Sequence, residues 1–289
     1  MTSSPEASTN PSPSVDSLIL HATDNGVSWI TLNRPEAMNA VTWDQRERII
    51  SLLADASADP GVRAVVITAT GKGFCAGADL RSGAPKVPST GTGPTPAPAR
   101  DRVPGDVART IRLGAQRLIT AVLDCEKPVI AAVNGTAAGL GAHLALACDL
   151  VIAAEQASFI EVFVRRGLVP DGGGAYLLPR LIGPQRAKEL MFFGDALPAA
   201  EAERLGLVNR VVPLSELEKT TRAWAERLAT GPTRALALTK QLVNASLDSD
   251  RSTALSAEAA AQEINMTTAD ANEGVASFVE RRTPRYRGL

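Results

Sequence analysis

The chain has 289 residues, 45% of them hydrophobic, which is enough for a substantial core in one large domain or in a domain with an appendage. Its 30 basic and 31 acidic residues nearly cancel, so the overall charge gives no reason to expect a nucleic acid or an anionic membrane as partner. Cys75, Cys125 and Cys148 are too few and too scattered for a disulfide framework or a metal site, which is typical of a reducing compartment. We therefore expect a cytoplasmic protein without a metal site.

The N-terminal part begins with residues 1–17, which are rich in Ser, Pro and Thr and have neither an apolar core nor a basic residue. This composition predicts a disordered leader and excludes a signal or transit peptide. Residues 18–21 and 27–32 then read as two strands around an Asp-Asn-Gly turn, which is a hairpin signal. A helix over residues 43–56 and a strand over residues 62–70 follow.

Residues 71–80 follow that strand and match two short motifs. Their glycines fit a dinucleotide fingerprint, and Gly-Phe-Cys-Ala-Gly resembles a nucleophile elbow with Cys75 as the nucleophile and His143 as a conceivable base. Both motifs require a helix directly afterwards. Residues 82–100 are instead rich in Pro, Gly, Ser and Thr and read as a mobile loop, so we expect Cys75 to be structural.

Residues 127–149 predict a strand, a glycine turn and a helix, with the strand over 129–133 and the helix over 142–148. Free N–H groups and the helix dipole at such a helix start stabilise an oxygen that gains negative charge. Gly139 and Gly141 leave room for a ligand to approach the main chain at Leu140. A tight packing turn in an α/β core is the alternative.

The second half of the chain reads as a helix over 109–123, a strand over 150–154 and a helix over 159–167, in which Glu161 and Arg165 are spaced for a surface ion pair. Asp171 precedes three glycines and a further helix. From residue 217 the chain reads as almost wholly helical, long enough for a separate region, so we divide it into a core over 18–216 and a C-terminal region over 217–289.

Six short motifs in this order resemble the crotonase superfamily, also called the enoyl-CoA hydratase/isomerase family. Together they extend over about 250 residues, which makes a chance match improbable. They are Asn33-Arg34-Pro35 with Met38-Asn39-Ala40; the run from Phe74 to Leu80; Asn134-Gly135 to Gly141 with Cys148-Asp149; Gly167 to Gly173; Ala202-Glu203 with Gly206 to Val212; and Glu273-Gly274 with Phe278 to Arg282.

The resemblance implies an α/β fold, a crotonase-like spiral of repeated strand–strand–helix units, with a helical C-terminal region that makes a homotrimer or a hexamer. It implies an acyl-CoA thioester as substrate, with coenzyme A entering as part of it and no other cofactor. It also implies that the backbone N–H groups of Ala78 and Leu140 form an oxyanion hole. The residues that it places along the coenzyme A moiety are Arg34, Ala37, Ala78, Asp79, Leu80, Arg81, Phe278 and Arg281. For Arg281 the alternative is a solvated side chain in the basic tail over residues 281–287.

The reaction depends on positions where this chain departs from typical hydratases of the family, which carry two glutamates. Those positions hold His143 and Phe163 here, and phenylalanine cannot transfer a proton, although it suits an apolar acyl group. Asp171 stands where several double-bond isomerases place their acidic residue. We therefore favour isomerisation with Asp171 as acid and base.

Four alternatives stay open at this point. Asp171 could be only a helix N-cap, and His143 could contact the substrate or influence Asp171, or be a polar residue satisfied in the core. A hydratase or hydrolase could use His143 or Glu161. A non-catalytic acyl-CoA-binding protein would also fit the loss of both glutamates.

Overall fold

A six-stranded sheet forms the centre of the computed structural model, which describes residues 14–80 and 104–289. Its strand order is β1-β2-β3-β5-β7-β10; the first pair is antiparallel and all other pairs are parallel. The strands are β1 (Ile19–Asp24), β2 (Val27–Leu32), β3 (Ala64–Ala69), β5 (Val129–Val133), β7 (Leu150–Ala154) and β10 (Arg210–Val212). The predicted hairpin of β1 and β2 is confirmed, with Asn25 and Gly26 at positive φ in its turn.

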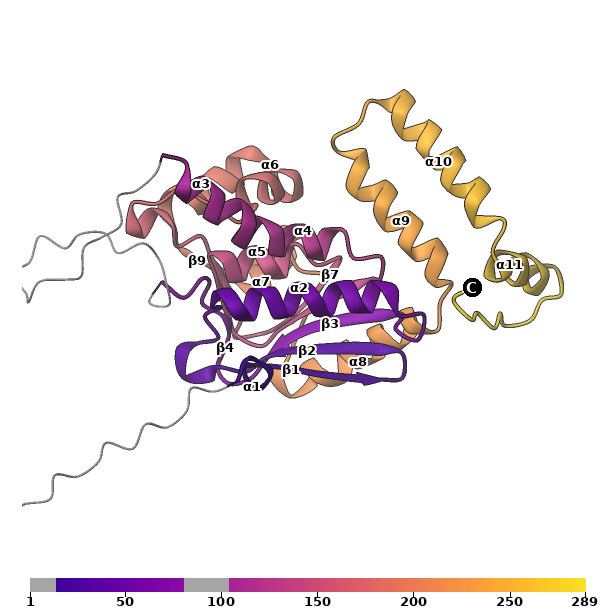
Figure 1. Cartoon of the computed structure of the whole chain (residues 1–289), viewed down its shortest axis with the longest axis horizontal. Helices are drawn as coiled ribbons and strands as arrows, with labels where there is room; N and C mark the ends of the chain where they lie inside the picture. Colours follow the sequence, from indigo (N-terminus) through magenta and orange to yellow (C-terminus); the bar gives the residue numbers. More distant parts are fainter. Residues whose placement is uncertain (1–13, 81–103) are drawn as a thin grey trace, which may run out of the picture.

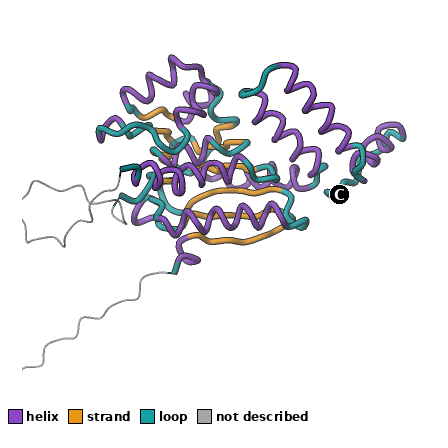
Figure 2. The backbone as a smooth tube through the Cα atoms, turned by 45° about the horizontal axis from the view of Figure 1, so that its top comes forward, coloured by secondary structure: helices purple, strands orange, loops and turns teal. Residues whose placement is uncertain are grey.

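A second, smaller sheet has the order β4-β6-β8-β9 and short strands. They are β4 (Gly73–Cys75), β6 (Thr136–Ala138), β8 (Ser158–Ile160) and β9 (Ala196–Pro198). Each of β3, β5 and β7 runs into one strand of the small sheet before the chain continues toward helices. The core is therefore a repeat of strand, strand and helix, in which the first strand lies in the large sheet and the second in the small sheet. Figure 2 shows the strands in the body of the molecule with helices around them.

Helices cover both faces of the large sheet (Figure 1). On one face, α2 turns Ile49, Leu52 and Leu53 into the main core, and its start is fixed by a capping box between Thr42 and Gln45. On the other face lies α8. The helices are α1 (Val15–Leu18), η1 (Pro35–Ala37), α2 (Trp43–Ala58), α3 (Asp106–Ile111), η2 (Arg112–Gln116), α4 (Arg117–Leu123), α5 (Leu140–Leu146), η3 (Val164–Arg166), α6 (Gly174–Phe193), α7 (Ala199–Arg204), α8 (Leu214–Ala229), α9 (Thr233–Ser246), α10 (Arg251–Asn265) and α11 (Ala269–Val279).

The C-terminal helices α9, α10 and α11 extend away from the sheets (Figure 1). The boundary that we placed between residues 216 and 217 falls inside α8, whose Leu217, Ala225 and Ala229 pack on the large sheet. The part of the chain that projects thus begins at α9. None of the helices in the two described ranges is both long enough and apolar enough to cross a membrane.

Two segments differ from the sequence-based predictions. Residues 15–17, which we assigned to the disordered leader, and residue 18, which we assigned to a strand, form α1. Residues 1–13 and the predicted loop over 82–100 lie outside the described residues. Residues 159–167 are not one helix, because the chain pairs there as β8 and then turns through the short η3. The pairing of β8 with β6 on one side and with β9 on the other thus outweighs the helical spacing of the apolar residues in this segment.

Asp149 joins the C-terminal helices to the core. Its carboxylate accepts a hydrogen bond of 2.7 Å from the backbone N–H of Val129, at the start of β5, and one of 2.8 Å from Nζ of Lys240 on α9. Lys240 also donates to the carbonyl of Val122 at 3.0 Å. Asp149 therefore ties β5 to α9, besides following the end of α5.

Candidate active site

The segment that leads from the end of β5 into the start of α5 is packed so closely that two of its positions admit only glycine. A Cβ atom at Gly141 would lie 2.1 Å from the carbonyl oxygen of Cys75, and one at Gly135 would lie 1.9 Å from that of Lys72. Glycine allows the backbones to approach this closely. The start of α5 is thereby held against β4 and against the segment that follows β4.

Two backbone N–H groups, those of Leu140 and Ala78, lie beside this contact. Leu140 is the first residue of α5, so its N–H has no acceptor within the helix. Val41 bonds to the carbonyl of Gly77 at 2.8 Å and to the N–H of Asp79 at 3.0 Å, and since successive N–H groups of an extended segment point to opposite sides, that of Ala78 faces away from Val41. Among the described residues neither N–H has a hydrogen-bond partner.

The two segments that carry these amides approach each other closely. A Cβ atom at Gly77 would lie 3.4 Å from the amide nitrogen of Leu140, and Gly77 has a φ of +99° that favours glycine. The residue after Gly77 is Ala78. The positions predicted for the two N–H donors are thus brought together, next to a helix start where the dipole favours negative charge.

Asp171 is half-buried in the loop before α6. The N-cap of α6 is Gly173 and carries no side-chain cap, so the alternative of an N-cap role for Asp171 is wrong. Burial raises the pKa of the Asp171 carboxyl, and the charges of His143 and Arg46 act in the opposite direction. Its backbone carbonyl accepts from Nε2 of Gln116 at 3.4 Å.

His143 lies on α5 and is completely buried. Its Nε2 is 3.1 Å from each carboxylate oxygen of Glu161, whose side chain is also buried. The ring stacks on Phe163 with 5.3 Å between centroids and 12° between planes. The expected surface pair between Glu161 and Arg165 is therefore wrong: the turn after β8 points Glu161 inward, where it binds His143.

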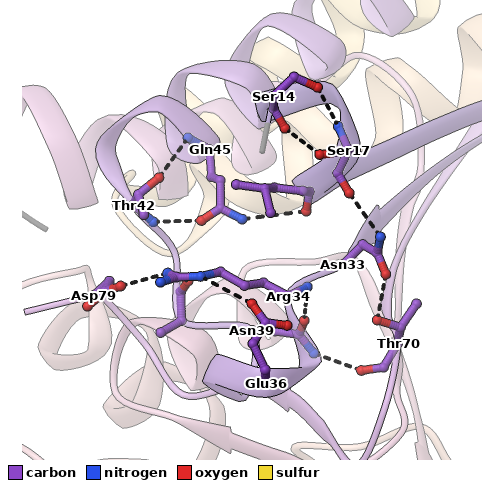
Figure 3. Close-up of polar contacts among 12 residues, drawn as sticks. Ser14, Ser17, Asn33, Arg34, Glu36, Asn39, Thr42, Gln45, Thr70 and Asp79 are labelled. Atoms are coloured by element: carbon purple, nitrogen blue, oxygen red, sulfur yellow. Dashed lines mark hydrogen bonds and ion pairs between the residues drawn. The ribbon is translucent and has the colours of Figure 1, made fainter. Parts of the chain in front are cut away.

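The predicted coenzyme A segments near Arg34 and Asp79 bind each other (Figure 3). Nη1 of Arg34 donates to Oδ2 of Asp79 at 2.6 Å and to the carbonyl of Ala40 at 3.3 Å. The amide of Asn39 bridges the carbonyls of Thr70 and Gly73, each at 2.8 Å. This network fixes the loop that contains η1 beside the segment after β4.

The other residues predicted to bind coenzyme A are dispersed. Ala37 is half-buried, Leu80 is 56% exposed, and Arg81 lies outside the described residues. Phe278 is 84% exposed on α11, and Arg281 follows that helix. Within one chain α11 lies far from α5, so the structure does not bring these last two residues to the Ala78 and Leu140 amides (Figure 1).

Cys75 does not have the surroundings of a nucleophile. It is fully buried on β4, and burial raises the pKa of its thiol to about 12, which disfavours the reactive thiolate. This agrees with the structural role that the sequence predicts. In the part of the chain that the structure describes, no group of three or more His, Cys, Asp and Glu side chains is arranged to hold a metal ion.

Sequence reasoning missed two features of the site. The first is the contact of Glu161 with His143. The second is Arg46 on α2, a half-buried guanidinium 4.9 Å from the ring centroid of Trp43, whose charge opposes the rise in the pKa of Asp171. The sequence gives no signal for Arg46, because helical spacing shows only which apolar residues face the core.

Comparison with known proteins gives a consistent result. Residues 22–288 match the family model described as enoyl-CoA hydratase/isomerase. A protein named probable enoyl-CoA hydratase from Rhodobacter capsulatus is 38% identical over 270 residues, which cover 93% of this chain and 98% of the relative. The 1,2-epoxyphenylacetyl-CoA isomerase of Escherichia coli K12 is also 38% identical over 270 residues, covering 93% of this chain and 98% of that protein. A crystal structure of an enoyl-CoA hydratase from Bacillus anthracis matches with a TM-score of 0.83 and 34% identity, over 94% of this chain and 100% of that one.

Proposed function

The chain belongs to the enoyl-CoA hydratase/isomerase family, the crotonase superfamily, and from that premise we propose that it moves the double bond of an enoyl-CoA thioester. The strand–strand–helix units and the helical C-terminal region have the fold of this family. The chain is thus an acyl-CoA enzyme of that family, and the choice of isomerisation is our proposal.

The proposed reaction transfers one proton between two carbons of the acyl group. The N–H groups of Ala78 and Leu140 bind the thioester oxygen, and Asp171 removes a proton from C2 of a 3-enoyl-CoA. The electron pair of that C–H bond moves into a dienolate whose negative oxygen the two N–H groups stabilise. Asp171 then returns the proton to C4, which leaves the double bond between C2 and C3. No water, metal ion or redox cofactor takes part.

The observation that carries this proposal is the carboxyl of Asp171, which does not cap α6 although it precedes that helix. The other candidate acids are already engaged, since Glu161 and His143 bind each other. Phe163 offers no proton at the position of the second hydratase glutamate. A single carboxylate supports a proton shuttle, whereas hydration in this family uses two.

The first experiment offers the purified chain 3-enoyl-CoA and 2-enoyl-CoA in separate reactions. We expect interconversion of the two without net uptake of water, and loss of this activity in Asp171→Asn. Fast hydration without isomerisation would contradict the proposal, and would favour the hydratase alternative. Saturable acyl-CoA binding without turnover across chain lengths would favour a non-catalytic binder. The panel should include aromatic acyl thioesters, given the name of the Escherichia coli relative.

The second experiment removes one oxyanion donor. Ala78→Pro deletes the N–H, whereas the matched control Ala78→Ser keeps it; the side chain at this position is exposed, so neither change disturbs the core. Loss of one such donor costs about 3 kcal/mol of transition-state stabilisation, roughly a hundredfold in kcat. Equal activities in the two variants would show that this N–H has no role in catalysis.

We also propose that coenzyme A is held between subunits of a homotrimer or a hexamer. Phe278 and the nearby Arg281 are exposed in a single chain and are distant from its own oxyanion donors. A second copy that presents α11 to this site would bring them to the ligand. Ala37, Leu80 and the Arg34–Asp79 contact would then contribute from the chain that supplies Ala78.

A further inference from the structure

The imidazole of His143 lies between Glu161 and the turn that carries Asp171. Its Nε2 is 3.1 Å from both carboxylate oxygens of Glu161. A Cβ atom at Gly172, the residue after Asp171, would lie 3.1 Å from Nδ1 of the ring, and one at Gly174 would lie 2.1 Å from Nε2. The glycine turn therefore rests directly on the imidazole, and any side chain at Gly174 would displace the ring.

The two ring nitrogens differ in their partners. An ionised carboxylate can only accept hydrogen bonds, so Nε2 must carry the hydrogen that it shares with Glu161. Nδ1 is buried and has no hydrogen-bond partner among the described residues. It is this unpartnered nitrogen that faces Gly172. The ring is thus oriented by Glu161 at one nitrogen and directed toward the Asp171 turn at the other.

The pair is closed off from water. The exposed fraction is 0% for His143 and 4% for Glu161, and Phe163 covers one face of the imidazole. A carboxyl group buried to this degree is costly unless it is hydrogen-bonded. His143 is the hydrogen-bond partner that the structure gives to Glu161.

Resting on the isomerase function above, we propose that Glu161 and His143 act as one positioning pair for Asp171. Glu161 keeps the imidazole in a single orientation, with the hydrogen on Nε2. The imidazole supports the Asp171 turn and directs Nδ1 toward it. Neither residue touches the substrate, and both act through Asp171.

The position of His143 has a defined effect on catalysis. Asp171 must be ionised to take the first proton, and its partial burial opposes ionisation. The groups that act to lower the pKa of the Asp171 carboxyl are His143 of α5 and Arg46 of α2, and the acidic group behind His143 is Glu161. If the contribution of His143 is lost, the pKa of Asp171 rises further. The acidic limb of the kcat/KM profile then moves upward.

The first test observes the pair without any enzymatic assay. The chain has only two histidines, so protein labelled with ¹⁵N-histidine gives two sets of imidazole signals, and the set missing in His21→Gln belongs to His21. We expect the His143 signals of the wild-type chain to show a hydrogen on Nε2. The Nε2 signal should move in Glu161→Gln, and the Nδ1 signal should move in Asp171→Asn. A ring whose signals are insensitive to both substitutions would overturn the proposal.

The second test is kinetic and uses His143→Gln, Glu161→Gln and the double variant. Glutamine at 143 can still donate to Glu161 but has no ring to support the Asp171 turn. We expect each single variant to lose about a hundredfold in kcat with little change in KM. In His143→Gln the acidic limb should also move upward, because the contribution of His143 to the pKa of Asp171 is lost. The double variant should resemble the single variants, because residues that act as a unit are not additive.

Matched controls are His21→Gln and Glu155→Gln, which change exposed residues outside the site and should retain wild-type profiles. Additive losses with an unmoved acidic limb, or a fall in thermal stability alone, would assign the pair a purely structural role and overturn the proposal. If the wild-type chain shows no isomerase activity, the proposed function fails while the ¹⁵N experiment still decides on the pair.

Discussion

The imidazole of His143 stacks on the phenyl ring of Phe163, with 5.3 Å between their centroids. These are the two positions at which family hydratases carry their glutamates. In this chain one is occupied by a ring whose Nε2 is bound to Glu161, and the other by an apolar side chain. Neither of these two positions therefore holds a carboxylate in this chain.

Phe163→Glu should fail to create a hydratase. The new carboxylate would be buried close to Glu161 without a second cation, which we expect to lower the free energy of unfolding by about 3 kcal/mol. Denaturant unfolding and a hydration assay measure the two effects. Phe163→Leu, which keeps the site apolar, should fold and isomerise. A stable Phe163→Glu variant that hydrates 2-enoyl-CoA would contradict this view.

Asp171→Asn should lose about a thousandfold in kcat with little change in KM, since it removes the proton carrier and leaves the oxyanion donors in place. Initial-rate assays with 3-enoyl-CoA measure the loss in kcat. Asp195→Asn, a change at an exposed aspartate beyond α6, provides the control. A variant that keeps full isomerase activity would remove Asp171 from the mechanism.

Asp171→Asn should lower the activity but raise the stability of the folded chain at pH 7. Burial raises the pKa of the folded-state Asp171 carboxyl, so its contribution to stability is present below the unfolded-state pKa and is lost as pH rises through the folded-state pKa. Asp171→Asn removes this penalty, and because Asp171 does not cap α6 no cap is lost. We expect the variant to unfold at a higher temperature than the wild type at pH 7, and the difference to shrink at acidic pH. A lower melting temperature at pH 7 would show that the carboxylate has a stabilising partner.

Gly141→Ala should destabilise the chain by about 2–3 kcal/mol and abolish activity, because its Cβ would lie 2.1 Å from the carbonyl oxygen of Cys75 and would push β4 from α5. Gly61→Ala is the control, since its nearest neighbour is the flexible end of the Asp59 side chain. Thermal unfolding and the isomerase assay report the two losses. Wild-type behaviour of Gly141→Ala would mean that the backbone can relax there without cost.

Mixed assemblies test whether coenzyme A is bound across subunits. We expect Phe278→Ser to raise KM several-fold without changing stability, since the side chain is 84% exposed. Coexpression with Asp171→Asn should restore activity at low substrate, because some sites combine an intact Asp171 with an intact Phe278. Coexpression of Asp171→Asn with the double variant Asp171→Asn/Phe278→Ser offers no such site and should stay inactive. No restoration would place Phe278 outside a shared site.

The candidate site divides into a part that the sequence predicts and a part that it does not. Leu140 is predictable because glycines mark where backbones approach, and Gly139 and Gly141 flank it. Ala78 is predicted only through the family resemblance, and Gly77 and Gly141 stand where the two segments approach each other. The motifs likewise identify the family and its repeated strand–strand–helix units. These signals are local, and each depends on a few consecutive residues.

The pair of Glu161 and His143 is not predictable in this way. The two residues are 18 positions apart, and their contact depends on the path of the chain after β8. Its apolar residues fit a helix as well as a strand, and only pairing with β6 and β9 selects the strand. A helix would have placed Glu161 on the surface, so one error in secondary structure hid the contact.

Lys240 gives the C-terminal helices a role within a single chain. It binds Asp149, which also holds the first residue of β5, and β5 leads through β6 to the amide of Leu140. Helices α9 to α11 therefore cannot be exchanged for those of another protein without regard to this contact. A chimaera needs a lysine at the position of Lys240. Without it, Asp149 loses one of the two donors that hold it at the start of β5, the strand that leads to the amide of Leu140.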